Sequence, residues 1–207
     1  MRRLGLTMLA ATLLLSGCSA PAHQYIAANG DGMYFALPAS WTQVPMKQLV
    51  KAQQGWTDDA GNVFRQTVRW QGVWSAHTID ADRAFAARPA SAPVVFAYVR
   101  DLVGVEQQGI GKDVKAALRD VLIPASSLPS GSVLTQTWTR SGFTGIHQTG
   151  TYVSGGAMQT TEVVSMLPPA RNRLYVFAMR CSESCYSAYG RDINAVFESL
   201  TFKEPRG

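Results

Sequence analysis

The sequence predicts a single α+β domain in which one antiparallel β-sheet is flanked by helices. Several short segments alternate apolar and polar residues, and the turns between the last of them are short, which favours hairpins over parallel crossovers. Apolar stripes with helical spacing lie in the middle and at the end of the 207 residues. About 170 residues follow the N-terminal region, which is enough for one domain with a substantial core.

The first elements are expected between residues 33 and 70. Residues 33–37 predict a strand that Pro38 ends, and residues 46–54 predict a short helix. Residues 57–62 consist of turn-forming residues, among them two aspartates, an asparagine and a glycine. Residues 63–70 alternate in the manner of a half-buried strand.

The middle of the chain predicts a helix over residues 80–87, capped by Asp80, and a strong strand over residues 94–102. The clearest helix is 111–123, where apolar residues fall on one stripe. The glycines just before it invite comparison with a phosphate-binding loop, but Glu106 and Asp113 stand where that motif requires Gly and Ser or Thr. We therefore expect a plain loop there.

The last part of the chain predicts three strands, a helix and a closing strand. The strands are expected over residues 133–147, where Gly142 and Gly145 are candidate break points, and over 159–166 and 174–180, separated by turns rich in Gly, Ser and Pro. A helix over residues 188–200 follows, and residues 201–202 are expected to complete the sheet.

Both ends of this region resemble a known fold. Residues 35–41 resemble the opening of the PsbP-like fold, a strand followed by Pro, two residues and Trp, and residues 193–202 resemble its closing helix and strand. This resemblance implies an α/β/α sandwich with a central antiparallel sheet. The fold includes a photosystem II subunit, a Ran-binding import factor and many bacterial lipoproteins. Because these relatives share no catalytic site, the resemblance implies no catalytic residue.

Residues 1–17 have the order of a bacterial secretion signal: Arg2 and Arg3, an apolar run, then small residues. The run is too short to cross a bilayer as a helix. Residues 15–18, Leu-Ser-Gly-Cys, resemble the lipobox of bacterial lipoproteins, which implies cleavage before Cys18 and lipidation of its thiol. Ordinary secretion, with cleavage after Ala20, is the alternative.

These features predict a protein held to the cell membrane by a lipid on Cys18 and facing the extracytoplasmic side. Residues 18–32 are expected to be the lipidated cysteine and a flexible tether, and residues 33–207 the globular domain. Removal of Arg2 and Arg3 with the signal lowers the net charge from +5 to +3. This small excess does not indicate a nucleic-acid partner.

Cys181 and Cys185 are expected to form a disulfide, because the compartment beyond the membrane is oxidising. Free thiols, or a redox or metal role, remain alternatives. His23, His77 and His147 are scattered along the sequence, so we expect no metal site, and nothing in the sequence indicates a cofactor.

Few residues suggest catalysis. His77 lies near Asp80 and Asp82 in the sequence, and Glu162 lies in the middle of a predicted strand, but motifs for a serine hydrolase or a zinc protease are missing.

Trp56 and Trp74 lie beside turns, where they either bind a partner or pack beneath their own loops. We therefore expect a non-catalytic module that binds a protein of the cell envelope. The alternatives are a carrier or sensor of a small apolar or lipidic ligand, and an envelope hydrolase with an unrecognised site.

Overall fold

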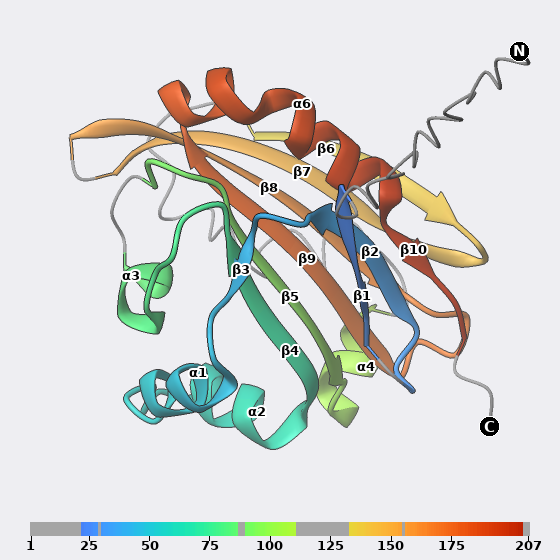
Figure 1. Cartoon of the computed structure of the whole chain (residues 1–207). Coiled ribbons are helices and arrows are strands. Elements are labelled where there is room, and N and C mark those ends of the chain that lie inside the picture. Colours follow the sequence, from blue (N-terminus) through green and yellow to red (C-terminus); the bar gives the residue numbers. More distant parts are fainter. Residues whose placement is uncertain (1–21, 29, 87–89, 111–132, 155, 205–207) are drawn as a thin grey trace, which may run out of the picture.

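The computed structural model describes residues 22–28, 30–86, 90–110, 133–154 and 156–204 (Figure 1). Its strands are β1 (His23–Ala27), β2 (Met33–Pro38), β3 (Thr42–Gln43), β4 (Val68–Ser75), β5 (Val94–Asp101), β6 (Val133–Arg140), β7 (Phe143–Ser154), β8 (Ala157–Leu167), β9 (Arg173–Ser182) and β10 (Thr201–Phe202). Its helices are α1 (Met46–Gln53), α2 (Asp59–Thr67), α3 (Ala81–Phe85), α4 (Gly104–Ile110) and α6 (Glu183–Ser199).

Within these ranges the strands form two sheets. The larger has seven strands in the order β3-β4-β5-β9-β8-β7-β6, and all of its pairs are antiparallel. The smaller has the order β1-β2-β10. The predicted fold class, α+β with an antiparallel sheet flanked by helices, is therefore confirmed, but the prediction of one sheet completed by residues 201–202 is wrong, because β10 pairs with β2 in a separate small sheet.

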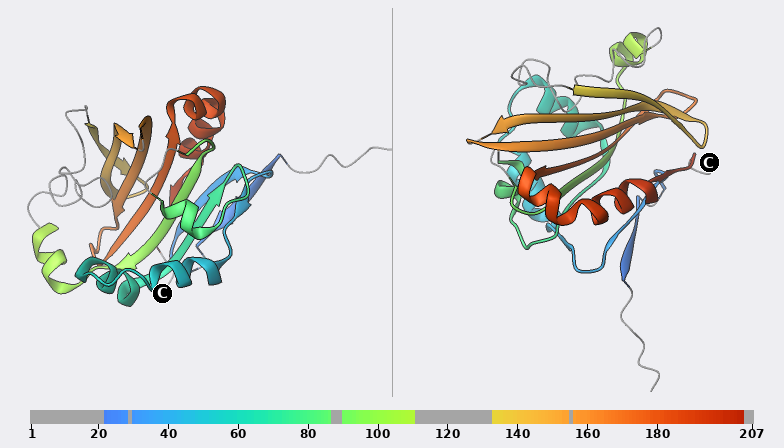
Figure 2. Two further views of the ribbon diagram at one scale, coloured as in Figure 1. Left: turned by 90° about the vertical axis from the view of Figure 1, so that its left-hand side faces the viewer. Right: turned by 90° about the horizontal axis from the view of Figure 1, so that it is seen from above.

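The small sheet and α6 cover one face of the large sheet (Figures 1 and 2). Phe35 of β2 packs edge-on against Trp74 and Phe177, with ring centroids 5.4 and 5.0 Å away. Ile193, Val196 and other apolar residues of α6 are buried in the same cluster. This face is closed by tightly packed aromatic side chains.

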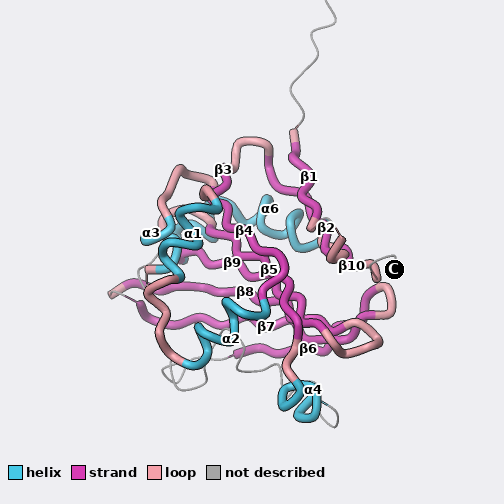
Figure 3. Tube along the Cα trace, turned by 90° about the horizontal axis from the view of Figure 1, so that it is seen from below, coloured by secondary structure: helices cyan, strands magenta, loops and turns pink. Residues whose placement is uncertain are grey.

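The opposite face carries α1, α2 and α3 along β4 and β5 (Figure 3). Leu49 of α1 and Ala84 of α3 are buried against Val73 of β4 and Val94 of β5. The Asp80 carboxylate accepts a hydrogen bond from the backbone N–H of Arg83 and caps α3, as the sequence predicts.

Most of the predicted elements are present. The strand of residues 33–37, the helix of 46–54 and the strand of 94–102 correspond to β2, α1 and β5. The predicted strand over 133–147 is two strands, because Ser141 and Gly142 adopt positive φ in the turn between β6 and β7. Helix α6 starts five residues before the predicted one, since the Ser182 hydroxyl accepts the Cys185 N–H and caps it.

Two predictions between residues 57 and 113 are wrong. The turn of 57–62 and the first half of the strand of 63–70 are helix α2, because Asp58 accepts the N–H of Gly61 and starts a helix there. The loop expected before residue 111 contains α4, where the Glu106 carboxylate accepts the N–H of Val103. In both cases an acidic side chain near the helix start supplies an acceptor that the turn-rich composition hid.

The predicted tether of residues 18–32 contains a strand. β1 pairs with β2 from His23↔Pro38 to Ala27↔Tyr34, and the Gln24 amide donates to two backbone carbonyls. Gly32 has a φ of +84°, and a Cβ there would collide with the Lys203 carbonyl, so this position requires glycine. The ordered domain therefore begins earlier than the composition predicts.

The secretion signal, Cys18 and the predicted helix of residues 111–123 lie outside the described residues. None of the helices within the described ranges is long and apolar enough to pass through a bilayer.

Candidate functional site

A cavity of about 1160 Å³ lies on the sheet face that α1, α2 and α3 cover. Its walls come from the connection between α1 and α2, from α2 and α3, and from strands β4, β5, β7, β8 and β9. Small-molecule sites commonly have volumes of roughly 300–1,000 Å³. This cavity is therefore large enough to hold a ligand of substantial size.

Five half-buried aromatic side chains line the cavity in a continuous series, which we call the aromatic arc: Phe96, Phe85, Trp56, Phe64 and Tyr98. Successive ring centroids are 5.8, 5.0, 5.8 and 5.1 Å apart. The series starts and ends on β5, because Phe96 and Tyr98 are two residues apart and share a face. The arc thus surrounds the cavity with apolar surface.

The local structure fixes Trp56 between two helices. Arg65 of α2 reaches back and donates from its guanidinium to the carbonyls of Gln53, at 2.9 Å, and of Trp56. Asn62 also accepts from this guanidinium. One arginine therefore holds the turn that carries the tryptophan against the sheet.

Polar groups in the cavity wall are paired at two places. The side-chain amides of Gln53 and Gln71 bond each other reciprocally, at 2.6 and 3.0 Å. Arg100 donates to both oxygens of Glu106, at 2.8 and 2.5 Å. These bonds from Arg100 lower the pKa of the Glu106 carboxyl, while burial raises the pKa of the neighbouring Tyr98.

Arg180 of β9 also lines the cavity but has a different environment. Its guanidinium donates to the carbonyls of Ala86, at 2.6 Å, of Arg83, at 3.0 Å, and of Ala84. It also lies 5.5 Å from the centre of the Phe96 ring. Burial lowers the pKa of Arg180, and its Nε is buried without a hydrogen-bond partner among the described residues.

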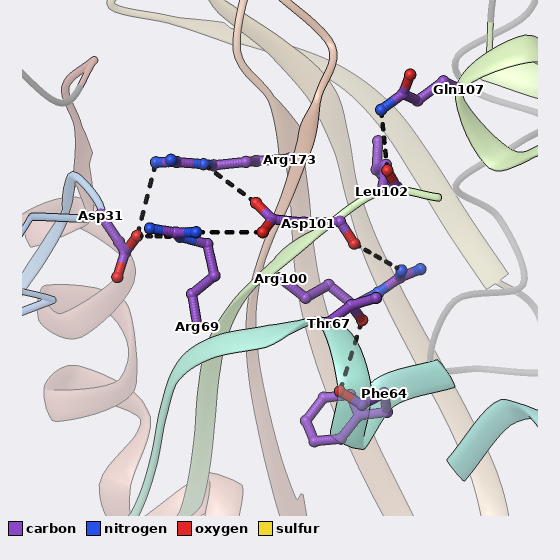
Figure 4. Close-up of polar contacts among 9 residues, drawn as sticks. All are labelled: Asp31, Phe64, Thr67, Arg69, Arg100, Asp101, Leu102, Gln107 and Arg173. Atoms are coloured by element: carbon purple, nitrogen blue, oxygen red, sulfur yellow. Dashed lines mark hydrogen bonds and ion pairs between the residues drawn. The ribbon is translucent and has the colours of Figure 1, made fainter. Parts of the chain in front are cut away.

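A second charged group lies away from the cavity (Figure 4). Asp31, in the turn between β1 and β2, pairs with Arg69 at 2.7 Å and with Arg173 at 3.6 Å. Asp101 pairs with the same two arginines, at 3.2 and 3.4 Å. Since these four residues join the small sheet to the end of the large one, we interpret the group as a structural link.

Of the two tryptophans predicted to bind a partner, only Trp56 lines the cavity. Trp74 is 1% exposed and packs against Phe35, because its side chain points to the face under the small sheet. The expectation that Trp74 is accessible to a partner is therefore wrong, and the two tryptophans do not form one site.

Cys181 and Cys185 are joined in the structure, with Cα atoms 5.5 Å apart, a separation suited to a disulfide. Both residues are buried under the start of α6. No group of three or more potential metal ligands occurs among the described residues.

The histidines have partners but no nucleophile. His147 Nε2 lies 3.0 Å from a Glu162 carboxylate oxygen, and its ring stacks on Phe197. His77 Nε2 lies 3.4 Å from the Tyr189 hydroxyl. Within the described ranges, no serine or threonine hydroxyl bonds to either imidazole ring, so neither arrangement has the geometry of a hydrolase.

Inspection of the sequence missed the arc and Arg180. The arc joins residues between 56 and 98 that lie on α2, α3, β5 and the connection before α2, and alternation around Phe64 predicts a strand instead of a helix. Arg180 gave one usable signal: it is a charged residue at the end of an otherwise apolar strand, Leu174–Met179. Such residues need a partner inside the protein or in a ligand.

Comparison with known proteins gives similarity only at the level of structure, since no family model and no curated protein matches the sequence. LpqN of Mycobacterium tuberculosis, described as involved in cell envelope biogenesis, has a TM-score of 0.49 at 14% identity, over 87% of this chain and 90% of its own. The Ran-binding protein Mog1p of Saccharomyces cerevisiae has a TM-score of 0.49 at 9% identity, over 87% and 95%.

A cyanobacterial PsbP from Synechocystis has a TM-score of 0.45 at 13% identity, over 90% of this chain and 96% of its own. Because the TM-scores are below 0.5 and the identities are low, these similarities do not establish a family, a partner or an activity.

Proposed function

We propose that this protein is a membrane-anchored extracytoplasmic lipoprotein whose domain carries or senses a small ligand with a large apolar surface. The observation that supports this function best is the aromatic arc around a cavity of about 1160 Å³. Five large rings contact one another in series there and yet remain half-buried. A ligand would cover this apolar surface and gain roughly 25 cal/mol for each Å² removed from water.

Binding is tested with a neutral apolar probe, methyl palmitate, added to the purified full chain. Trp56 is the tryptophan that lines the cavity, so its fluorescence should change as the cavity fills. Trp56→Phe should abolish that change, whereas Trp138→Phe should retain it because Trp138 lies beside His147 on the other face. Absence of saturable binding to the wild-type chain would contradict the proposed function.

The membrane anchor rests on the lipobox-like residues 15–18. Metabolic labelling with a fatty acid is expected to mark the wild-type protein and not the Cys18→Ala variant. Equal labelling of both proteins would contradict lipidation at Cys18.

A second candidate function is binding of an envelope protein. Leu134, Val153 and Met158 are 59, 57 and 40% exposed and share one face of β6, β7 and β8. Exposed apolar side chains of this kind occur at protein interfaces. Changing all three to serine should remove a protein that crosslinks to the wild-type chain in intact cells, and an unchanged crosslinking pattern would exclude this face as the interface.

A further inference from the structure

We infer that the ligand of the cavity is an anionic amphiphile, whose hydrocarbon part contacts the aromatic arc and whose acidic group binds at Arg180. This inference rests on the proposed function and specifies its ligand.

Arg180 lacks an anionic partner. Among the described residues no carboxylate lies within ion-pair distance of its guanidinium, and its bonds go to three neutral carbonyls at the end of α3. A guanidinium has five N–H donors, so donors remain after these three bonds. Arg180 is partly buried, and since a charge removed from water without a counter-ion is unfavourable, an acidic ligand group would stabilise this site.

Two hydroxyl groups lie beside this arginine in the cavity wall. Thr161 of β8 is the cross-strand neighbour of Arg180, and its hydroxyl lies 3.2 Å from that of Tyr152. Both residues line the cavity, and because one hydroxyl donates its proton to the other, one O–H remains to donate a hydrogen bond to an anion. The end of the cavity at Arg180 therefore presents a cation and one neutral donor.

At the other end of the cavity, the arginine already has an anionic partner. Arg100 is already neutralised by both oxygens of Glu106. Arg180 lies opposite Val94 of β5, six residues before Arg100, which places the two arginines about 20 Å apart along the sheet. The remaining cavity acids, Asp58 and Asp59, are exposed at the start of α2. An anionic group is thus favoured at Arg180 and not at Arg100.

The aromatic arc would bind the apolar part of the ligand. Phe96 lies directly beneath the Arg180 guanidinium and contacts Phe85, from which the series continues through Trp56. A hydrocarbon chain that leaves the arginine therefore meets a row of rings. Carboxylate and phosphate head groups share the chemistry needed at Arg180, because both accept hydrogen bonds from a guanidinium.

The experiment compares palmitate, methyl palmitate and a lysophosphatidic acid by titration of Trp56 fluorescence in the lipid-free full chain. We expect palmitate to bind about ten-fold more tightly than its uncharged ester, a difference of one ionic contact. Arg180→Gln should remove this preference by weakening palmitate binding and leave binding of the ester unchanged. The relative affinity of the lysophosphatidic acid decides between a carboxylate and a phosphate head group.

Arg140→Gln is the matched control, because Arg140 also donates to a backbone carbonyl, that of Glu198, but does not line the cavity. It should keep the preference for palmitate. If Arg180→Gln fails to fold, Arg180→Lys serves in its place: it retains the positive charge and should keep part of the preference. Equal binding of palmitate and ester to the wild-type chain, or a preference that survives in Arg180→Gln, would overturn the inference alone. Failure of every probe to bind would overturn the proposed function as well.

Discussion

The two faces of the large sheet use aromatic residues in opposite ways. Under α6 and the small sheet, Phe35, Trp74 and Phe177 are almost completely buried and touch edge to face. Under α1, α2 and α3, the rings of the aromatic arc are half-exposed around a cavity. Residues of the same kind therefore stabilise the fold on one face and remain available to a ligand on the other.

The largest loss of stability is expected from a substitution at Phe177, which is 0% exposed and contacts both Phe35 and Phe197. Phe177→Ala should lower the free energy of unfolding by about 3–5 kcal/mol, through lost burial and the cavity it leaves. Phe85→Ala in the arc should cost only about 1 kcal/mol, since little packed volume is lost there. Urea unfolding of both variants measures the difference, and equal losses would refute the contrast.

Removal of the disulfide on the packed face should cause a smaller loss of stability than Phe177→Ala. Replacing Cys181 and Cys185 by serine should lower the free energy of unfolding by about 2 kcal/mol, because the bridge closes only a short loop. Affinity for methyl palmitate should stay unchanged, since neither cysteine lines the cavity. Weaker binding of the ester by a folded double variant would show that the two faces are coupled.

The smallest effect concerns pH on the cavity face. The bonds from Arg100 lower the pKa of Glu106, so this residue stabilises the fold above the ordinary glutamate pKa of about 4.3. That contribution is lost as the pH falls through the lower pKa of the folded state. Glu106→Gln should therefore show a shallower fall of Tm on acidification than wild type, and parallel curves would contradict this assignment.

The sequence predicted the packed face better than the cavity face. Alternation in β2 and β5, and the apolar stripe of α6, follow directly from burial on one side, which local periodicity reports. The cavity exists because the side chains around it leave a space between them, and local periodicity does not report such a space. Trp56 was noticed because it lies beside a turn, but its proximity to Phe85 and Phe64 arises from the tertiary packing of three short helices.

Two errors have a common physical origin. The sequence predicts a tether at residues 23–27 and a turn at 57–62, where small, polar and glycine residues dominate, and a strand at 63–70, where residues alternate. In the folded chain β1 is stabilised by its pairing with β2, and α2 by the Asp58 cap and the carbonyl bonds of Arg65. At both places, interactions between segments determine the secondary structure. A local sequence pattern does not report such interactions.

The position of β1 limits how this domain would stand on a bilayer. With an acyl group on Cys18, the chain has only four residues before His23, a reach of about 18 Å when fully stretched. The small sheet would then be held close to the lipid head groups, with the seven-stranded sheet between it and the cavity. The cavity would then lie farther from the anchoring leaflet than the small sheet does.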